Sequence, residues 1–441
     1  MTDIIFSFDT EDFTSNEAAD AIITEAEILK GEGIKGCFCV VGLLAKQLQN
    51  WKRKDVIEAL SHHEIASHSY GHTLHPTINE YTDIEDFETA HALVMSKEQE
   101  AVDILRDTFS RDKIYAACPP GNQKSYVAMY AYSDMGIPVY ADTFCDTDDG
   151  RGVFYCNIYN VIYNYCMEDT FFEANENDLE KLLDELAKNN RVVLYTHPNY
   201  SLFSEWWDVL NYDKVNMCEF GKWKECKRRP KEESDRFYKN LRTIAKLLKN
   251  DKRFRITTYS ELANEISKEG ERNITLSDIP ALHKEITYNF YPVTNPVSYS
   301  LSDMFLACKE FLLGKTEHIC AKVYGFLETP YAISEEITLT KAELIKSAEE
   351  IENDTFLPNE IMVGDKKIGP GDWLRAAMEI LEGKETVTLT PGPQMPDLDV
   401  LPQVKNCSLL GWRQSDEFKD KFLSKRLKLQ AWTMRFLPEN Y

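Results

Sequence analysis

The sequence predicts an α/β protein, with a parallel (β/α) barrel followed by a mostly helical C-terminal domain. Two observations lead to this prediction. Strand-like and helix-like segments alternate over residues 1–268, and this alternation stops near residues 267–273, where Lys, Glu and Gly mark a linker. Helical patterns dominate the remaining residues, 274–441. A chain of 441 residues is also too long for one ordinary core, which agrees with two domains.

Strand and helix patterns follow one another along the N-terminal part. The predicted strands are residues 4–9, 36–41, 64–67, 114–117, 138–141, 155–163, 192–196 and 254–258. Helical patterns lie between several of them, at residues 16–30, 86–109, 123–133, 178–188 and 233–249. This order favours a parallel barrel over separate small units, and in such barrels catalytic residues lie where strands end and βα loops begin.

An internal repeat characterises the C-terminal domain. Residues 299–315 and 368–384 share a helical pattern with matching Asp, Ala, Glu, Leu, Gly and Lys positions. Each copy follows a Ser or Gly-Pro start signal and ends in Gly, so each is expected to be a capped amphipathic helix of a duplicated unit. Trp412 and Trp432 are interpreted as core residues rather than a ligand platform.

Composition restricts the partners and the location of the protein. A net charge of −23 argues against nucleic acid, anionic membranes and polyanionic substrates. No apolar run approaches the ~20 residues that span a bilayer, and no secretory signal is visible, so a cytoplasmic location is predicted. The eleven cysteines are odd in number, scattered and without a CxxC pair, which favours reduced thiols.

Three carboxylates crowd together where the first predicted strand ends. Asp9, Glu11 and Asp12 lie within the segment FDTED at residues 8–12. Carboxylates this close repel one another and resist burial. A bound divalent cation would relieve the repulsion, and the strand end is where a barrel places its catalytic residues.

Histidines follow two other predicted strands. His68 and His72 lie in SHHEIASHSYGH at residues 61–72, four positions apart, and would share one face if this loop were helical. Imidazoles suit zinc and related ions, and such sites often add a carboxylate. His197 follows the β-branched run at residues 192–194. One rim of the barrel would then carry a base, a metal triad and a free histidine.

These segments together resemble the polysaccharide deacetylase family, which includes the chitooligosaccharide deacetylases of nodulation-factor synthesis. The first family motif is matched by FDTED, the second by HEIASHSYGH at residues 63–72, and the late motif by Thr-His-Pro at 196–198. The resemblance covers roughly residues 1–268. It implies a distorted (β/α)7-type barrel and hydrolysis of an N-acetyl amide.

The expected chemistry needs one divalent metal ion, with zinc the first choice. Held by His68, His72 and a carboxylate, the ion would lower the pKa of its water to about 7 and polarise the acyl oxygen. Asp9 would be the general base that accepts the proton of this water, and His197 the general acid that protonates the leaving amine.

The carboxylate ligand stays open between Glu11 and Asp12. In some family members the base and the metal carboxylate are separated by one residue, which points to Glu11. Positions i and i+2 of a strand also project to the same face, so Glu11 would lie on the side of Asp9. Asp12 lies beyond the strand and is the rival ligand.

One motif departs from the family pattern. The family's Arg-x-Pro-x-Gly reads Ala-Cys-Pro-Pro-Gly at residues 117–121, so Ala117 replaces the arginine that would orient the base. Pro119 and Gly121 retain the rest of the motif and are expected at the substrate. Trp206 and Trp207, shortly after the late motif, could stack on a sugar ring or cap the barrel.

Three functions are weighed on these residues. The leading one is a cytoplasmic metal-dependent deacetylase that acts on a small or oligomeric N-acetylated carbohydrate, a sugar or glycan precursor. The second is hydrolysis of a non-sugar amide, as in allantoinase-like relatives. The third is a non-catalytic carbohydrate-binding or scaffold protein. The C-terminal domain could cover the barrel mouth, form a homo-oligomer or bind a partner.

Overall fold

The computed structural model describes the chain except for residues 143–144, 148, 215–216, 293–296, 353–355, 398–403, 408–413 and 438–441. Two compact units make up the chain. The first comprises Met1–Gly152, Ile158–Asn264 and Gln403–Leu423, and the second comprises Val153–Asn157, Glu265–Pro402 and Ser424–Tyr441. Val153–Asn157 therefore belongs to the second unit although its sequence neighbours belong to the first, and Gln403–Leu423 belongs to the first unit although its neighbours belong to the second.

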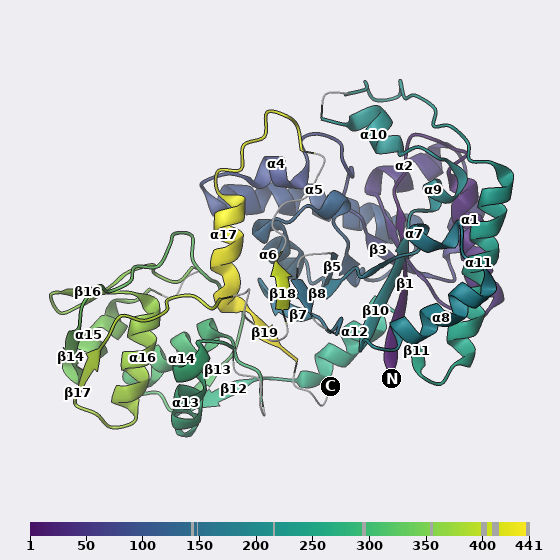
Figure 1. Cartoon of the computed structure of the whole chain (residues 1–441). Helices are drawn as coiled ribbons and strands as arrows, with labels where there is room; N and C mark the ends of the chain where they lie inside the picture. The colour runs from purple at the N-terminus through teal and green to yellow at the C-terminus, as the bar shows by residue number, and fades with distance from the viewer. Residues whose placement is uncertain are drawn as a thin grey trace. The chain divides into compact units, whose positions relative to one another are not determined.

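A curled parallel sheet forms the centre of the first unit (Figure 1). Its strands stand in the order β8, β5, β4, β3, β2, β1, β10, β9, and β11 pairs with the start of β1. The bounds are β1 (Thr2–Thr10), β2 (Cys37–Val40), β3 (Glu64–Ser67), β4 (Ala116–Ala117), β5 (Val139–Asp142), β8 (Ile158–Ile162), β9 (Tyr165–Cys166), β10 (Arg191–Thr196) and β11 (Phe254–Ile256). The predicted α/β class is confirmed. Among the described strands, no pairing of β8 with β9 closes the barrel.

The central strand, β1, explains the apolar start of the sequence. Parallel strands pair with it on both sides, β10 on one and β2 on the other. Ile4, Ile5 and Phe6 are completely buried. A strand covered on both faces needs a nearly continuous apolar run rather than an alternating one. Ser7 and Asp9 are two positions apart and therefore project to the same face at the C-terminal end of the strand.

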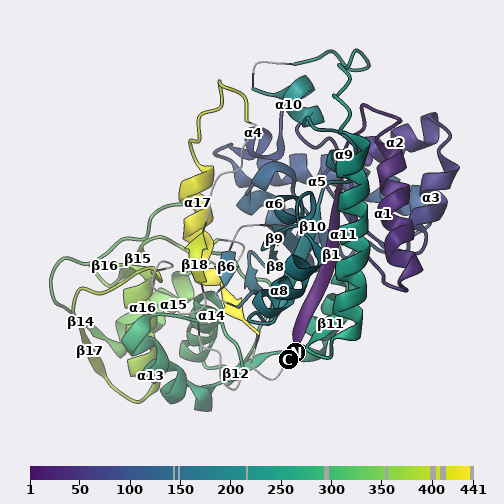
Figure 2. The ribbon, with the colours of Figure 1, turned by 45° about the vertical axis from the view of Figure 1, so that its right-hand side comes forward.

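Helices follow most of these strands. Figures 1 and 2 show α1 and α11 side by side next to β1, and the two helices are in contact. The longer helices are α1 (Ala19–Gly31), α2 (Gly42–Asn50), α3 (Lys54–Leu60), α5 (Phe87–Phe109), α6 (Tyr126–Asp134), α8 (Glu176–Leu186), α11 (Lys231–Asn250) and α12 (Tyr259–Ile266). Short helices follow several strand ends: α4 (Ile78–Thr82), α7 (Glu168–Phe171), α9 (Pro198–Leu202) and α10 (Trp207–Tyr212). A separate antiparallel pair, β6 (Cys145–Thr147) and β18 (Val404–Cys407), completes this unit.

The second unit combines helices with short antiparallel pairs. Its helices are α13 (Ile279–Asn289), α14 (Leu301–Leu312), α15 (Lys341–Glu350), α16 (Pro370–Leu381) and most of α17 (Leu423–Leu429). The pairs are β12 (Asn273–Thr275) with β13 (Glu317–Ile319), β14 (Ile337–Thr340) with β17 (Thr386–Leu389), β15 (Ile361–Val363) with β16 (Lys366–Ile368), and β7 (Val153–Tyr155) with β19 (Arg435–Phe436).

The two sequence copies correspond to α14 and α16, which pack against each other. The rings of Phe305 and Trp373 lie 4.7 Å apart at this contact, and both side chains are completely buried. Trp432 is also completely buried in the same core, as expected, whereas Trp412 lies outside the described residues. That the copies are a duplicated unit stays a prediction. No helix in the described part of the chain is long and apolar enough to cross a membrane.

Candidate metal centre and catalytic groups

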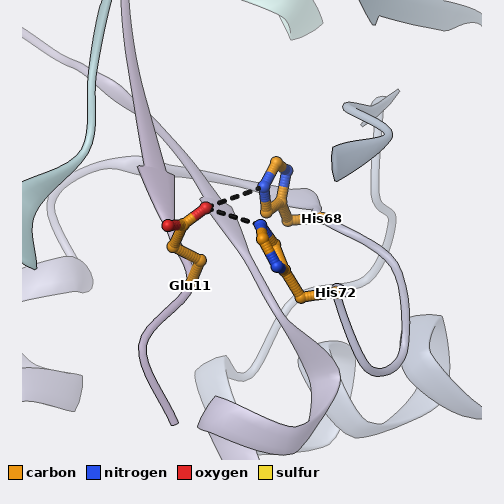
Figure 3. Close-up of side chains that lie close together, drawn as sticks. All are labelled: Glu11, His68 and His72. Carbon is orange, nitrogen blue, oxygen red and sulfur yellow. Dashed lines mark ion pairs between the residues drawn. The ribbon is translucent and has the colours of Figure 1, made fainter. Parts of the chain in front are cut away.

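Glu11, His68 and His72 come together at one end of the first unit's sheet (Figure 3). Glu11 directly follows β1, and His68 directly follows β3. The Oε2 atom of Glu11 lies 2.7 Å from His72 Nε2 and 3.5 Å from His68 Nε2. The three residues are between 2% and 5% exposed. This is the only group of His, Cys, Asp and Glu in the described part of the chain whose geometry suits a metal ion.

The donor atoms fit a divalent ion. His68 is buried, and neither of its ring nitrogens has a hydrogen-bond partner among the described residues. Burying an unpaired polar group is costly, and an ion would satisfy the nitrogen that faces Glu11. The ligand–ligand edge of a zinc tetrahedron is about 3.3 Å, which lies between the two distances measured here. Thr73 Oγ1 lies 3.1 Å from His72 Nδ1, an outer contact that orients the ring.

A loop, rather than the helical face considered above, brings the two histidines together. No helix covers this segment, and Ser69 and His72 both have left-handed backbone angles, with φ of 65° and 54°. Residues other than glycine rarely adopt this backbone conformation, and those that do are concentrated at functional sites. Ser69 Oγ accepts a hydrogen bond from His72 N at 3.0 Å, which closes the turn.

The structure brings Glu11, not Asp12, to the histidines. Trp207 Nε1 donates a hydrogen bond of 2.9 Å to Glu11 Oε1 and leaves Oε2 facing both imidazoles. Burial alone would raise the pKa of Glu11, but His72 and His68 lower it well below its usual range, so the carboxylate is ionised.

Asp12 is occupied locally and lies outside the metal-fitting group. Its Oδ1 atom accepts hydrogen bonds from Thr14 N, Thr14 Oγ1 and Ser15 N, which stabilise the turn after the strand. Burial raises the pKa of Asp12 to about 7, although the bonds from Thr14 oppose this change. With its Oδ1 atom engaged in this turn, Asp12 is not one of the residues that gather with the two histidines.

Asp9 and His197 face each other beside this group. Asp9 Oδ2 lies 3.6 Å from His197 Nε2, and Asp9 Oδ1 accepts a hydrogen bond of 3.0 Å from the Tyr163 hydroxyl. Ala117, in β4, is completely buried and offers no polar side chain to Asp9. Tyr163 therefore supplies the hydrogen bond to Asp9 that the side chain of Ala117 cannot supply.

Glu168 holds His197. One carboxylate oxygen, Oε1, lies 3.0 Å from His197 Nδ1 and accepts bonds from His197 N at 2.7 Å and Thr196 Oγ1 at 2.8 Å. Burial alone would lower the pKa of His197, but Glu168 and the more distant Glu11 and Asp9 raise it to about 10. The raised pKa favours the imidazolium form of His197 at neutral pH, and its Nε2 atom lies on the side of Asp9.

Sequence reasoning missed Glu168 and Tyr163. Tyr163 directly follows β8, and Glu168 begins α7 shortly after β9, so both stand at strand ends where catalytic groups gather. Nothing in the sequence pointed to Glu168, because the strand before it, β9, is only two residues long and has no recognisable pattern. The tyrosine that ends the predicted strand at residues 155–163 was a usable signal for Tyr163, since strand ends carry the catalytic groups of such barrels.

A cavity of about 260 Å³ connects these groups. Asp9, the metal-fitting group and His197 line it, as do Tyr163 and Glu168. Pro119, Gly121 and Trp206 also line the cavity, as their assignment to the substrate requires. Among the described lining residues there is no lysine or arginine.

The two tryptophans have different positions. Trp206 lines the cavity, its ring stacked on Tyr200 at 4.2 Å and edge-on to His197 at 4.7 Å. Trp207 is completely buried and does not line the cavity. Trp207 is therefore not placed to stack on a sugar ring, because its ring is covered and its N–H bonds Glu11; of the two roles left open above, its burial favours the structural one.

Comparison with known proteins finds likeness only among solved structures. No protein-family model matches the chain, and no curated protein sequence matches it. A probable polysaccharide deacetylase from Pseudomonas aeruginosa PAO1 is similar with a TM-score of 0.40 and 11% identity, over 61% of this chain and 91% of that one. A family 4 carbohydrate esterase from Streptomyces lividans, in complex with acetate, has a TM-score of 0.31 and 13% identity, over 57% and 90%. Puue allantoinase has a TM-score of 0.39 and 12% identity, over 60% and 90%.

Proposed function

We propose that this protein is a metal-dependent hydrolase that removes an N-acetyl group from a sugar or glycan precursor in the cytoplasm. Its first unit would be an open variant of the (β/α)7-type barrel. One observation carries the proposal: a single small cavity holds a metal-fitting Glu-His-His group together with Asp9 and with His197, which Glu168 holds through Nδ1. Acyl-amide hydrolysis needs these groups, namely a site for an ion, a base and an acid for a poor leaving group.

Glu11, His68 and His72 would hold the ion. When bound there, a divalent ion, zinc in the first place, activates water for attack and polarises the acyl oxygen. The buried hydrogen bond from Trp207 Nε1 to Glu11 Oε1 keeps the other oxygen, Oε2, directed toward the histidines. Each of the three metal-fitting side chains is buried within the first unit, so packing restrains its orientation before substrate binds.

Asp9 acts as the base and His197 as the acid. The Tyr163 hydroxyl donates a hydrogen bond to Asp9 Oδ1, so the other oxygen, Oδ2, accepts the proton of the attacking water. Glu168 holds His197 Nδ1, which leaves Nε2 to donate its proton to the departing amine. The raised pKa of His197 supports this order, because the group enters the reaction already protonated.

The charge and size of the cavity favour a neutral substrate of small size. Carboxylates from Asp9, Glu11 and Glu168 line it, together with Asp169 and Asp208, and the basic side chains among its described lining residues are histidines, with no lysine or arginine. An anionic substrate would be repelled, whereas an acetylated sugar is neutral and its amine product is cationic. A volume of about 260 Å³ is below the ~300–1,000 Å³ of drug-sized pockets, so one acetylated unit fits. The ring of Trp206 offers that unit an apolar wall.

A non-sugar amide is the second candidate. The same small cavity would admit a compact amide as well as one sugar unit, and Ala117 departs from the family motif at the base. A purely binding role is disfavoured, because Asp9, His197 and the metal-fitting group are all retained and converge on one space.

The decisive test combines metal analysis with product detection. The full chain, purified without chelator, is analysed for bound metal and assayed for acetate release from N-acetylglucosamine oligomers with added zinc or cobalt. His68→Ala is expected to lose the metal and Asp9→Asn to keep it without turnover, while His62→Ala, an exposed neighbour, changes neither. Absence of both metal and activity would overturn the proposal, and metal with cleavage of other amides alone would favour the second candidate.

A further inference from the structure

A line of buried hydroxyl groups ends on Asp9. The Tyr259 hydroxyl donates to Ser7 Oγ at 3.1 Å, Ser7 Oγ lies 2.9 Å from the Tyr163 hydroxyl, and Tyr163 donates to Asp9 Oδ1 at 3.0 Å. Ser7 and Tyr259 are completely buried, and Asp9 is 6% exposed. These contacts join β1 to the residue after β8 and to the start of α12.

We propose that Tyr163 is a positioning residue for the base: its hydroxyl, oriented by Ser7 and Tyr259, holds Asp9 Oδ1 so that Oδ2 faces the cavity. This inference rests on the proposed function for its catalytic consequence. Its structural content, a strong hydrogen bond from a neutral phenol to Asp9, can be tested without turnover.

The direction of the hydrogen bonds follows from the acceptor at the end. The Tyr163 hydroxyl donates to Asp9 Oδ1, and a phenol has a single hydrogen, which is therefore committed to Asp9. Tyr163 can then only accept from Ser7, and Ser7 in turn accepts from Tyr259. Each donation polarises the next one, which strengthens the last bond beyond that of an isolated phenol.

The phenol is held in place by its surroundings. Its ring stacks on Tyr195 at 4.8 Å with an interplanar angle of 28°. Burial, with Asp9 nearby, raises the pKa of Tyr163 well above its usual value, so the group keeps its proton. The Cys39 thiol lies 3.4 Å from both Tyr163 and Ser7, but a thiol is a weak donor and acceptor and does not replace either bond.

A phenol restrains a carboxylate differently from a guanidinium. Arginine presents several donors in a fixed fork and can engage both carboxylate oxygens at once. A tyrosine has one donor and engages one oxygen, which leaves the second oxygen of Asp9 free to accept a proton. The neighbour of that second oxygen is His197 Nε2 at 3.6 Å, too distant for a strong hydrogen bond.

The catalytic test compares Tyr163→Phe with Tyr165→Phe in the full chain. The Tyr165 hydroxyl bonds Thr170 Oγ1 at 2.7 Å and does not line the cavity, so its removal is the matched control. One hydrogen bond to a charged acceptor corresponds to a loss in kcat of about tenfold to a hundredfold, with KM and metal content nearly unchanged. Ser7→Ala should cause a smaller loss in the same direction. A kcat that stays within about twofold of wild type in Tyr163→Phe would overturn the positioning role.

A double-mutant cycle tests the contact independently of activity. Urea unfolding is measured for wild type, Tyr163→Phe, Asp9→Ala and the double variant. We expect Tyr163→Phe to lower the unfolding stability when Asp9 is present and not when it is absent, with a coupling of at least tenfold in the equilibrium constant. The cycle with Tyr165→Phe should be additive. A coupling below twofold refutes the hydrogen bond, even if Tyr163→Phe is inactive. An inactive wild type with intact coupling refutes only the proposed function.

Discussion

Replacing Trp207 with phenylalanine tests how the metal-fitting group is held together. The substitution removes the indole N–H that donates to Glu11 Oε1 at 2.9 Å but keeps an aromatic ring against Phe13, 4.8 Å away, and His72, 5.1 Å away. Among the described residues, the Trp207 N–H is the side-chain group that hydrogen-bonds Glu11 from outside the histidine pair, so without it the carboxylate would be able to rotate. The expected effect is therefore on metal affinity rather than on the fold.

The magnitude follows from the environment of this bond. Donor and acceptor are both buried and the acceptor is charged, so the bond is worth about 1.5–3 kcal/mol. Since about 1.4 kcal/mol corresponds to a factor of ten, the metal dissociation constant should rise by about tenfold to a hundredfold. The larger value applies if Oε2 turns completely away from the histidines.

The assay is a competitive titration of zinc against a chromophoric chelator. Trp223→Phe is the matched control, because the Trp223 N–H bonds the Tyr212 hydroxyl at 2.6 Å in the same aromatic cluster and does not contact Glu11. Equal zinc affinities for the two variants, within about twofold, would show that the Trp207 bond does not position Glu11.

Three further outcomes are expected. Glu168→Gln should lower the pKa of His197 from about 10, so activity, which requires the protonated imidazole, should be lost at a lower pH on the alkaline limb of a pH–rate profile; an unchanged limb contradicts the assigned acid. Glu25 is a buried carboxyl in α1, and burial raises its pKa to about 8, so its contribution to stability is full below the ordinary pKa of 4.5 and is lost as pH rises through 8. The stability of Glu25→Gln relative to wild type, measured by urea unfolding, should therefore increase between pH 5 and 8 by a few kcal/mol at most. A stability difference that stays constant over this range contradicts the sign. Chelation of bound metal should lower the thermal midpoint of wild type but not of His68→Ala, and equal shifts would mean that the ion binds elsewhere.

Much of the site could be predicted because its residues follow strands with strong patterns. The apolar run before Asp9 identifies a buried central strand, and His68 and His197 each come directly after another strand. The two-residue period of a strand also favours Glu11 over Asp12 as the metal ligand. The structure agrees, because it places Glu11 beside the histidines.

The remaining features depend on contacts that a linear sequence does not show. Glu168 and Tyr163 meet His197 and Asp9 only through the order of the strands in the sheet. The role of Trp207 stayed open between sugar stacking and a structural one, because an indole carries both an apolar face and an N–H donor and the sequence does not show which of them the fold uses. Asp12 had an available signal, since a hydroxyl residue two positions later favours the turn that now engages its carboxylate.

The spacing along β1 makes this segment intolerant of insertions and deletions. Ser7, Asp9 and Glu11 occupy every second position. They supply, in that order, the hydroxyl that bonds Tyr163, the proposed base and the metal-fitting carboxylate. A point substitution here alters one of these roles. Removing a single residue between them would shift the following positions by one and turn the next side chains to the opposite face. An engineered change of length at this strand end is therefore expected to abolish the whole site in one step, while the apolar half of β1, Ile4 to Phe6, would still form the sheet.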